Sequence, residues 1–135
     1  MNLSDAEAAI SSAQSAAAAK GLTVSIAVVD AGAYLVAFTR MDGAMLGSID
    51  VAFRKARTAA LFRTDSGALG KLAVPGGPIH SIEHSNSGLV LIGGGVVLKD
   101  AAGMTIGAIG ISGATAVQDE AIAQAAVLPS EYSAA

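Results

Sequence analysis

Hydrophobic and polar residues alternate with a period of two from Leu22 to Val29, where every second residue up to Val28 is a large aliphatic one. Threonine, serine and alanine stand between them. We therefore expect a strand covered by bulky groups on one face and by a close neighbour on the other. Asp30 to Ala33 is predicted to form a hairpin connection, and Tyr34 to Met41 the returning strand.

Four other segments carry helical signals. The first is rich in alanine, opens with the capping box S-x-x-E of Ser4 and Glu7, and meets a stop signal at Gly21. The second places its apolar residues at helical spacing behind Ser48, its expected N-cap. The predicted helices run from Ser4 to about Lys20, from Ser48 to about Phe62, from Asp65 to Leu72 and from Thr115 to about Leu128, with a frayed tail after that.

A glycine-spaced strand precedes the last of these helices. Gly107, Gly110 and Gly113 recur every third position in an otherwise β-branched run. Glycine weakens a strand through its backbone entropy, so this spacing indicates that something approaches the backbone closely. A packed helix, a neighbouring subunit and a flat ligand all satisfy the pattern.

The order of elements predicts the fold class. Short apolar runs at Leu89 to Ile92 and Val96 to Lys99 lie between a turn-rich region, Pro75 to Gly88, and the glycine-spaced strand. The resulting order is helix, hairpin, helices, loop, strands, helix. This order favours an α+β domain, an antiparallel sheet with helices packed against it, over an alternating β-α-β chain. The 135 residues are expected to form a single domain.

Composition changes this picture in one respect. Charged residues make up 14% of the chain and hydrophobic ones 53%, against about 25% charged in an ordinary domain. With so few charged residues, part of the surface must be apolar, and contacts with a membrane or with other subunits could cover it. No apolar run approaches the length of a membrane helix, so we expect no membrane partner and predict a homo-oligomer, a dimer or larger.

Charge and residue types exclude further classes. The formal net charge is −3 and aromatic residues are 4%, so we expect no nucleic-acid partner. The chain has no cysteine, hence no disulfide and no thiolate nucleophile. No basic segment followed by an apolar core opens the sequence, so we expect a cytoplasmic protein.

The turn-rich region holds both histidines of the chain. His80, Glu83 and His84 spell H-x-x-E-H, the inverted zinc-protease signature. Pro78 and the Ser-Asn-Ser-Gly run after His84 leave no room for a long supporting helix, so a protease is disfavoured. A looser use stays open: His80 and His84 as ligands to haem iron or another metal, or His80, Glu83 and His84 as acid or base.

The joint between the glycine-spaced strand and the last helix is a second candidate. The sequence G-I-S-G-A around Ser112 falls one residue short of the nucleophile elbow G-x-S-x-G. The amides after Ser112, through Gly113 to Thr115, could bind an anion at the helix start. The capping box of Thr115 and Gln118 favours a structural role instead.

Two cations complete the set of candidate ligand contacts. Arg40 is expected at the end of the second strand, and Lys55 one step from the apolar face of the second predicted helix. Each is weighed against the common role of a surface charge whose stem covers apolar groups. An anionic ligand would need such groups in a chain with few cations.

Four segments carry a family resemblance. They are Ile26 to Ala44 (IAVVDAGAYLVAFTRMDGA), Ser48 to Ala60 (SIDVAFRKARTAA), the triple glycine at Gly93 to Gly95, and Ile106 to Ala123 (IGAIGISGATAVQDEAIA). On these segments the chain resembles the GlcG/HbpS family, also known as DUF336 or the haem-degrading domain family, which includes the C-terminal domain of PduO-type proteins. The resemblance covers nearly the whole chain.

The resemblance implies a profilin-like α/β/α sandwich in three layers, with a five-stranded antiparallel sheet, helices on both faces and an oligomeric state. It implies haem binding in some members, whereas others are linked to corrinoid or glycolate metabolism. Some relatives carry an iron ligand on a histidine of the first helix, and this chain has none there. His80 and His84 are the imidazoles that remain.

Three hypotheses follow. The first is an oligomeric protein that binds haem or another flat organic molecule between the His80–His84 loop and the Ser112–Gly113 turn. The second is a cofactor-independent enzyme on a small organic acid or carbonyl compound, with His80, Glu83 or His84 as acid or base and Arg40 or Lys55 holding the anion. The third is an accessory structural oligomer without a ligand.

Overall fold

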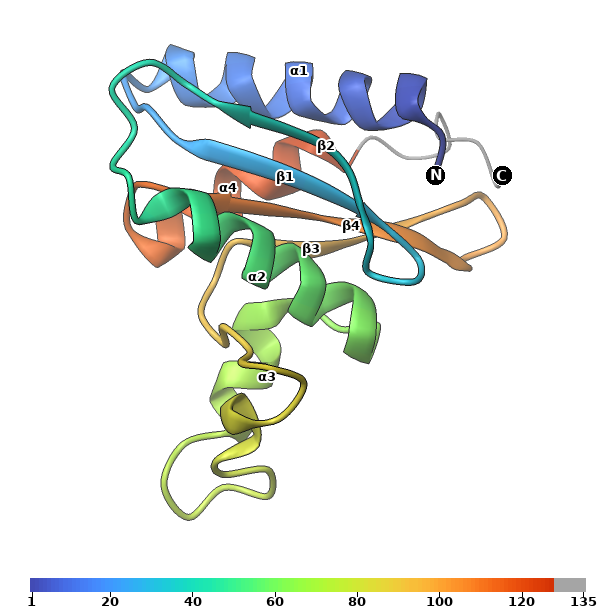
Figure 1. Ribbon diagram of the computed structural model, residues 1–135, viewed down its shortest axis with the longest axis vertical. Helices are drawn as coiled ribbons and strands as arrows, with labels where there is room; N and C mark the ends of the chain where they lie inside the picture. Colours follow the sequence, from blue (N-terminus) through green and yellow to red (C-terminus); the bar gives the residue numbers. More distant parts are fainter. Residues whose placement is uncertain (128–135) are drawn as a thin grey trace.

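The computed structural model describes residues 1–127 of the chain and builds one four-stranded sheet between two layers of helices (Figure 1). The predicted end of the last helix at Leu128 and the tail after it lie outside the described residues. In chain order the elements are α1 (Leu3–Ala19), β1 (Ser25–Asp30), β2 (Leu35–Arg40), α2 (Ser48–Phe62), α3 (Ser66–Leu72), the 3-10 turn η1 (Ile82–His84), β3 (Gly95–Lys99), β4 (Thr105–Ser112) and α4 (Ala116–Ala126).

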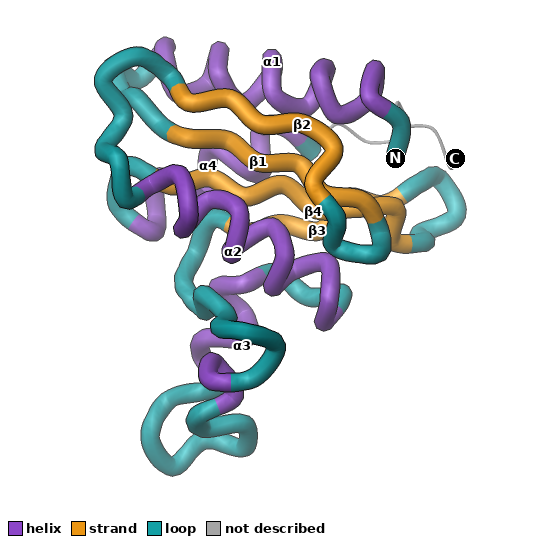
Figure 2. The backbone as a smooth tube through the Cα atoms, in the orientation of Figure 1, coloured by secondary structure: helices purple, strands orange, loops and turns teal. Residues whose placement is uncertain are grey.

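The strand order across the sheet is β2-β1-β4-β3, and every pairing is antiparallel. Helices α1 and α4 cover one face, and α2 covers the other, as Figures 1 and 2 show. The α+β prediction with helices on both faces is confirmed. Among residues 1–127, no helix is both long and apolar enough to cross a membrane.

The predicted fifth strand is absent from the described residues. Its sequence candidate, Leu89 to Ile92, runs past α2 and α3 instead of joining the sheet: the Val90 amide donates to the Thr58 hydroxyl at 3.1 Å, and the Leu91 carbonyl lies against Gly70. An apolar run of four residues has the same pattern whether it is buried in a sheet or against helices, which is why the sequence misled here.

The alternation predicted for β1 is confirmed. Val24, Ile26 and Val28 belong to the core under α1 and α4, whereas Ala27 and Val29 belong to the core under α2. The strand begins three residues later than predicted, because Leu22 still donates its amide to the Ala17 carbonyl at the end of α1. Both faces of β1 are therefore buried, the face with its larger aliphatic residues under α1 and α4 and the other under the small residues of α2.

At Gly110 the close neighbour is helix α2. A Cβ atom on this glycine would overlap the carbonyl oxygen of Ala52 and stand 2.6 Å from the amide nitrogen of Ala56. Of the three alternatives for the glycine spacing, the packed helix is therefore the one found at this position. The other two glycines of the series meet backbone as well, Gly107 at the Val29 carbonyl and Gly113 at the Thr23 carbonyl.

Two predicted helix caps are wrong. Helix α1 begins at Leu3 and is capped by Asn2, whose side-chain oxygen accepts from the Asp5 amide at 2.8 Å, so the box of Ser4 and Glu7 does not form the cap. Helix α2 begins at Ser48 itself, and that hydroxyl bonds to Ser25 on β1 at 2.9 Å. At α1 the cap is a local contact three residues along the chain, whereas at α2 the Ser48 hydroxyl is engaged by a residue of the sheet.

One edge of the sheet, strand β3, is protected. On β3 the amides of Gly95 and Val97 donate to the Ser66 hydroxyl at 2.8 Å and to the Asp65 carboxylate at 3.0 Å, so the start of α3 caps this edge. Asp65 is the N-cap residue of α3, as predicted, but its carboxylate serves the strand rather than the helix. Protected edges discourage pairing with another chain.

Replacing Gly110 with alanine should destabilise the protein by about 3 kcal/mol or more, because the added Cβ would collide with backbone that cannot move without shifting α2. Chemical denaturation measures this loss. Gly47→Ala is the control, since nothing lies within 4 Å of that position and its φ is −61°. A change within about 1 kcal/mol in both variants would contradict the close packing of α2 on β4.

Candidate functional site

The joint between β4 and α4 is built mainly by its own hydrogen bonds. The Thr115 hydroxyl accepts from the Gln118 amide, and the Gln118 side chain accepts from the Thr115 amide, so the predicted capping box is present. The Ala114 amide donates to the Asp119 carboxylate at 3.0 Å, and Ser112 is buried. Three amides of this joint are thus already bonded within the protein.

A buried ion pair lies behind this joint. Lys55 Nζ on α2 is 3.0 Å from Asp119 Oδ2 on α4 and donates to the Ile111 carbonyl of β4 at 2.9 Å. The two side chains are 1% and 3% exposed. The pair thereby connects helices on opposite faces of the sheet, at the end where β4 stops and β3 starts.

The glycines before β3 make room for the lysine. A Cβ on Gly94 would lie 2.8 Å from Lys55 Nζ and 2.9 Å from its Cδ, and the backbone there has φ +132°. A Cβ on Gly95 would overlap the Lys55 carbonyl, and one on Gly93 would lie 2.8 Å from the Ala116 carbonyl. The triple glycine is thus explained by close packing around the buried side chain.

The two cations predicted as ligand contacts, Lys55 and Arg40, differ in their accessibility. Lys55 is enclosed and fully engaged, so a ligand could reach its ammonium group only if the pair with Asp119 opened. Arg40 is exposed at the end of β2. Because Ser25 pairs with Arg40 on one side and with Ser112 on the other, Arg40 and the joint lie at the same end of the sheet, two strand spacings apart.

The predicted histidine site lies on an exposed loop. His84 Nε2 is 3.8 Å from Glu83 Oε1, with 84% of the histidine side chain exposed, and His80 Nδ1 is 3.4 Å from the Ser81 hydroxyl. The segment forms one 3-10 turn instead of the long helix that a zinc protease uses. Within residues 1–127 there is no group of three or more His, Cys, Asp or Glu side chains that could hold a metal ion.

Two arginines of α2 hold this loop against the body, and sequence reasoning missed them. Arg54 donates through Nη1 to the carbonyls of Ser87 and Gly88, at 2.6 and 3.0 Å. Arg57 donates through Nη1 to the Asn86 carbonyl at 2.6 Å. Asn86 and Ser87 both have positive φ, a costly conformation outside glycine. Because the acceptors are backbone atoms, no residue pattern could have indicated them.

The two halves of the predicted ligand site do not meet within one chain. In Figures 1 and 2 the segment from α3 through η1 projects from the face covered by α2, away from the joint where α4 begins. Arg40 lies with the joint, and His80, Glu83 and His84 lie with the loop. A ligand in contact with both halves would have to bind between two subunits.

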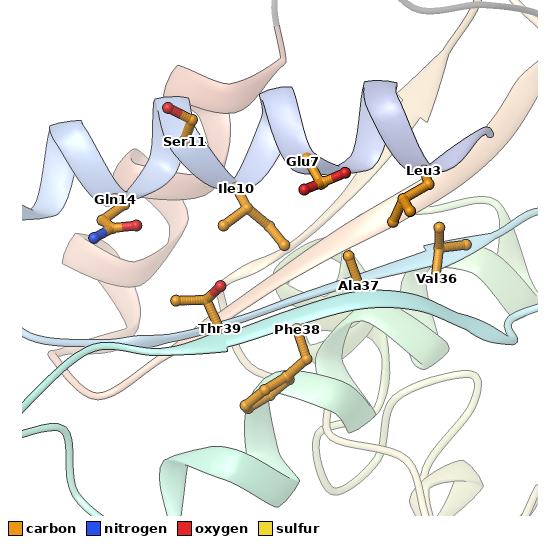
Figure 3. A pocket seen from close by; sticks show the side chains of 9 residues that line it. All are labelled: Leu3, Glu7, Ile10, Ser11, Gln14, Val36, Ala37, Phe38 and Thr39. Atoms are coloured by element: carbon orange, nitrogen blue, oxygen red, sulfur yellow. The ribbon is translucent and has the colours of Figure 1, made fainter.

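A groove between α1 and β2 is a further concave surface, of about 400 Å³ (Figure 3). Ile10 and Leu3 point from α1 toward β2, and the side chains of Glu7 and Gln14 lie beneath the same helix, while Phe38 points to the opposite side of the strand. The lining residues are Leu3, Glu7, Ile10, Ser11, Gln14, Val36, Ala37, Phe38 and Thr39. None of these nine is a cation or a histidine.

Comparison with known proteins decides the family. The model of the family described as haem-degrading protein HbpS-like matches residues 1–128. The chain belongs to the HbpS-like family. The resemblance inferred from the four sequence segments is thus confirmed, and the match spans all elements of the fold.

Individual relatives agree with the HbpS-like assignment. An uncharacterized protein of Citrobacter freundii is 32% identical over 113 residues, which cover 81% of this chain and 80% of that protein. The corrinoid adenosyltransferase PduO of Salmonella typhimurium is 37% identical over 106 residues, but these cover 77% of this chain and only 31% of PduO. The chain therefore corresponds to about a third of that enzyme.

A solved structure gives the link to a ligand. The structure described as a PduOC:heme complex superposes with a TM-score of 0.89 and 32% identity, covering 94% of this chain and 92% of that one. The protein in that complex shares this fold and binds haem.

Asp119→Asn should lower the free energy of unfolding by about 3–5 kcal/mol, because it leaves the Lys55 ammonium buried without its counter-charge. Chemical denaturation measures the loss. The control is Asp50→Asn, which breaks the exposed pair with Arg54 and should cost no more than about 1 kcal/mol. Equal losses in the two variants would contradict a structural role of the buried pair.

Proposed function

We propose that this chain is a small-molecule-binding protein whose ligand is haem or another flat organic molecule. The observation that carries the proposal is the likeness to the PduOC:heme complex, which extends over 94% of the chain. Family membership over residues 1–128 supports it. The adenosyltransferase activity of PduO is not part of the proposal, because the chain covers only 31% of that enzyme.

The chain has side chains that could coordinate haem iron. Haem iron takes a histidine, thiolate, methionine or tyrosine as its protein ligand. His80 and His84 are the two imidazoles of the chain, and both are exposed on a loop that two arginines hold in place. Bound haem would supply an iron centre, and His80 or His84 would bind it. The groove of Figure 3 offers no imidazole for this purpose.

We place the ligand between subunits. The histidine loop and the Ser112–Gly113 turn lie apart in one chain (Figure 1), so a site that uses both needs the loop of one subunit against the joint of another. Arg40, exposed beside the joint, would then face the acidic groups of the ligand, together with Ser112, Gly113 and Thr115 of the joint.

The geometry favours binding over acid–base catalysis. His80 and His84 lie in solvent rather than in an enclosed cavity, where a general base works best. Of the two anion contacts of the catalytic alternative, Arg40 and Lys55, the lysine is buried against Asp119. The enzyme hypothesis therefore has no geometric observation in its favour.

Haem titration tests the proposed ligation. The Soret band of added haem should shift on binding, and the shift should weaken in His80→Ala or His84→Ala, since one imidazole is removed in each. Glu83→Gln is the matched control, because it changes the same loop without removing an imidazole. Identical spectra for the wild type and both histidine variants would exclude ligation by these residues.

We also propose self-association, on the basis of exposed apolar side chains. Large apolar side chains are exposed at several places in the described residues, among them Met45 at 65%, Leu46 at 73% and Val117 at 81%. Light scattering at micromolar concentration should therefore give the mass of a dimer or a larger oligomer, because association removes such surface from water. A monomer mass of 13.2 kDa across the micromolar range would contradict the proposal.

A further inference from the structure

A cavity of about 510 Å³ lies between the tip of the β1–β2 hairpin and the second half of α2. This volume falls within the usual range for small-molecule pockets, about 300–1,000 Å³. It belongs neither to the joint nor to the groove of Figure 3. Its lining residues are Gly32, Ala33, Tyr34, Leu35, Phe53, Arg57 and Leu61.

The lining is aromatic and aliphatic. Tyr34 and Phe53 contribute two rings, one from the hairpin and one from α2. Tyr34 is 76% exposed, Leu35 52% and Leu61 40%. Phe53 is half-buried and packs on the core under α2, so it forms a fixed wall. Removal of such apolar area from water by a flat apolar molecule is energetically favourable.

The hairpin that carries Tyr34 is held rigidly. The Asp30 carboxylate accepts the amides of Gly32 and Tyr34 at 2.9 and 3.0 Å, which turns its oxygen toward the backbone. Ala33 between them has φ +68°, a conformation that costs an alanine energy. The cavity wall thus includes a strained residue next to the exposed ring.

The β3–β4 hairpin has the same type of turn as the β1–β2 hairpin, and a comparison of the two shows how the β1–β2 hairpin differs. Asp100 accepts the amides of Ala102 and Met104 in the same way, at 3.0 and 2.9 Å. There a glycine, Gly103, takes the positive φ without strain, and Met104 stands where the first hairpin has Tyr34. The two turns share one backbone design, and only the first combines strain with an aromatic ring at a cavity.

Arg57 supplies the polar group of the cavity. One of its nitrogens, Nη1, donates to the Asn86 carbonyl, and a guanidinium group carries five N–H donors. The ion pairs found among residues 1–127 use Arg54, Lys55 and His84, so no described carboxylate neutralises Arg57. A half-buried guanidinium at the rim of an apolar cavity suits the carboxylate of a ligand.

We propose that this cavity binds a flat aromatic molecule that bears a carboxylate, with its ring system against Tyr34 and Phe53 and its carboxylate on Arg57. The inference rests on the proposed function, because it assigns the same class of flat organic ligand to a second site, apart from the one between subunits. It goes further in that it names a site within one chain and a recognition mode that needs no iron. Arg57 connects this site to the histidine loop through Asn86.

Metal-free protoporphyrin IX is the probe, since it is flat, carries carboxylates and cannot be held by an axial ligand. The fluorescence anisotropy of the porphyrin itself reports binding. Arg57→Gln should weaken binding at least tenfold, and Tyr34→Ser at least threefold. Arg57→Lys should recover part of the loss, because it restores the charge but not the planar group.

Arg54→Gln is the matched control. Arg54 lies one helical turn away and holds the same loop, but it does not line the cavity. Its variant should bind protoporphyrin IX within twofold of the wild type. Circular dichroism of all variants shows whether the fold is kept, and Arg57→Lys provides a second reading if Arg57→Gln does not fold.

The outcomes separate this inference from the proposed function. The inference is overturned, and the proposed function is kept, if the Soret shift depends on the histidines but porphyrin binding is unchanged in the Arg57 and Tyr34 variants. Arg57-dependent porphyrin binding without any histidine-dependent shift supports the cavity and rejects the iron ligation. If Tyr34→Ser instead converts an oligomer to a monomer and leaves porphyrin binding unchanged, a second copy covers the cavity and the inference fails.

Discussion

The ion pair between Lys55 and Asp119 is the constraint on which the rest of the structure depends. Two opposite charges removed from water are costly unless each is paired and hydrogen-bonded, and here both conditions are met, by the Ile111 carbonyl and by the Ala114 amide. The pair fixes α2 on one face of the sheet to α4 on the other. It also explains why glycine is needed at Gly94, where any side chain would occupy the space of the lysine.

The hydrogen bonds around this pair limit what the joint can offer to a ligand. The amides at the start of α4 are taken by Thr115, Gln118 and Asp119, which leaves the joint mainly a packing element. Helix α2 does more: its small residues lie against Gly110, while Arg54 and Arg57 on the other side hold the histidine loop. The surfaces open to a ligand include the loop, the hairpin tip, the groove beside β2, and the exposed side of the joint at Arg40 and Thr115.

Local signals in the sequence predicted local structure well. The alternation of β1, the capping box of Thr115 and the close approach at Gly110 each follow from neighbouring residues, and each is confirmed. The failures have different causes. Leu89 to Ile92 has a tertiary one, because this run packs on helices instead of extending the sheet. The cap of α1 is a local choice, in which Asn2 rather than Ser4 accepts an amide three residues along the chain.

The candidate site was harder to predict than the fold. The partner of Lys55 lies 64 residues away, and the partners of Arg54 and Arg57 are backbone carbonyls, which no sequence pattern marks. The roles of His80, Glu83, His84 and Arg40 stay predictions. Tyr34 and Phe53 were not among the predicted ligand contacts, because the cavity that both line forms only when the hairpin folds against α2.

A double-mutant cycle on the buried pair tests the central claim most directly. Lys55→Met, Asp119→Asn and the double variant are compared with the wild type by chemical denaturation. Each single variant leaves one buried group without its partner, so the account predicts that the double variant is more stable than the sum of the two losses requires, with a coupling free energy of about 2 kcal/mol or more. Losses that simply add, within about 0.5 kcal/mol, would contradict it.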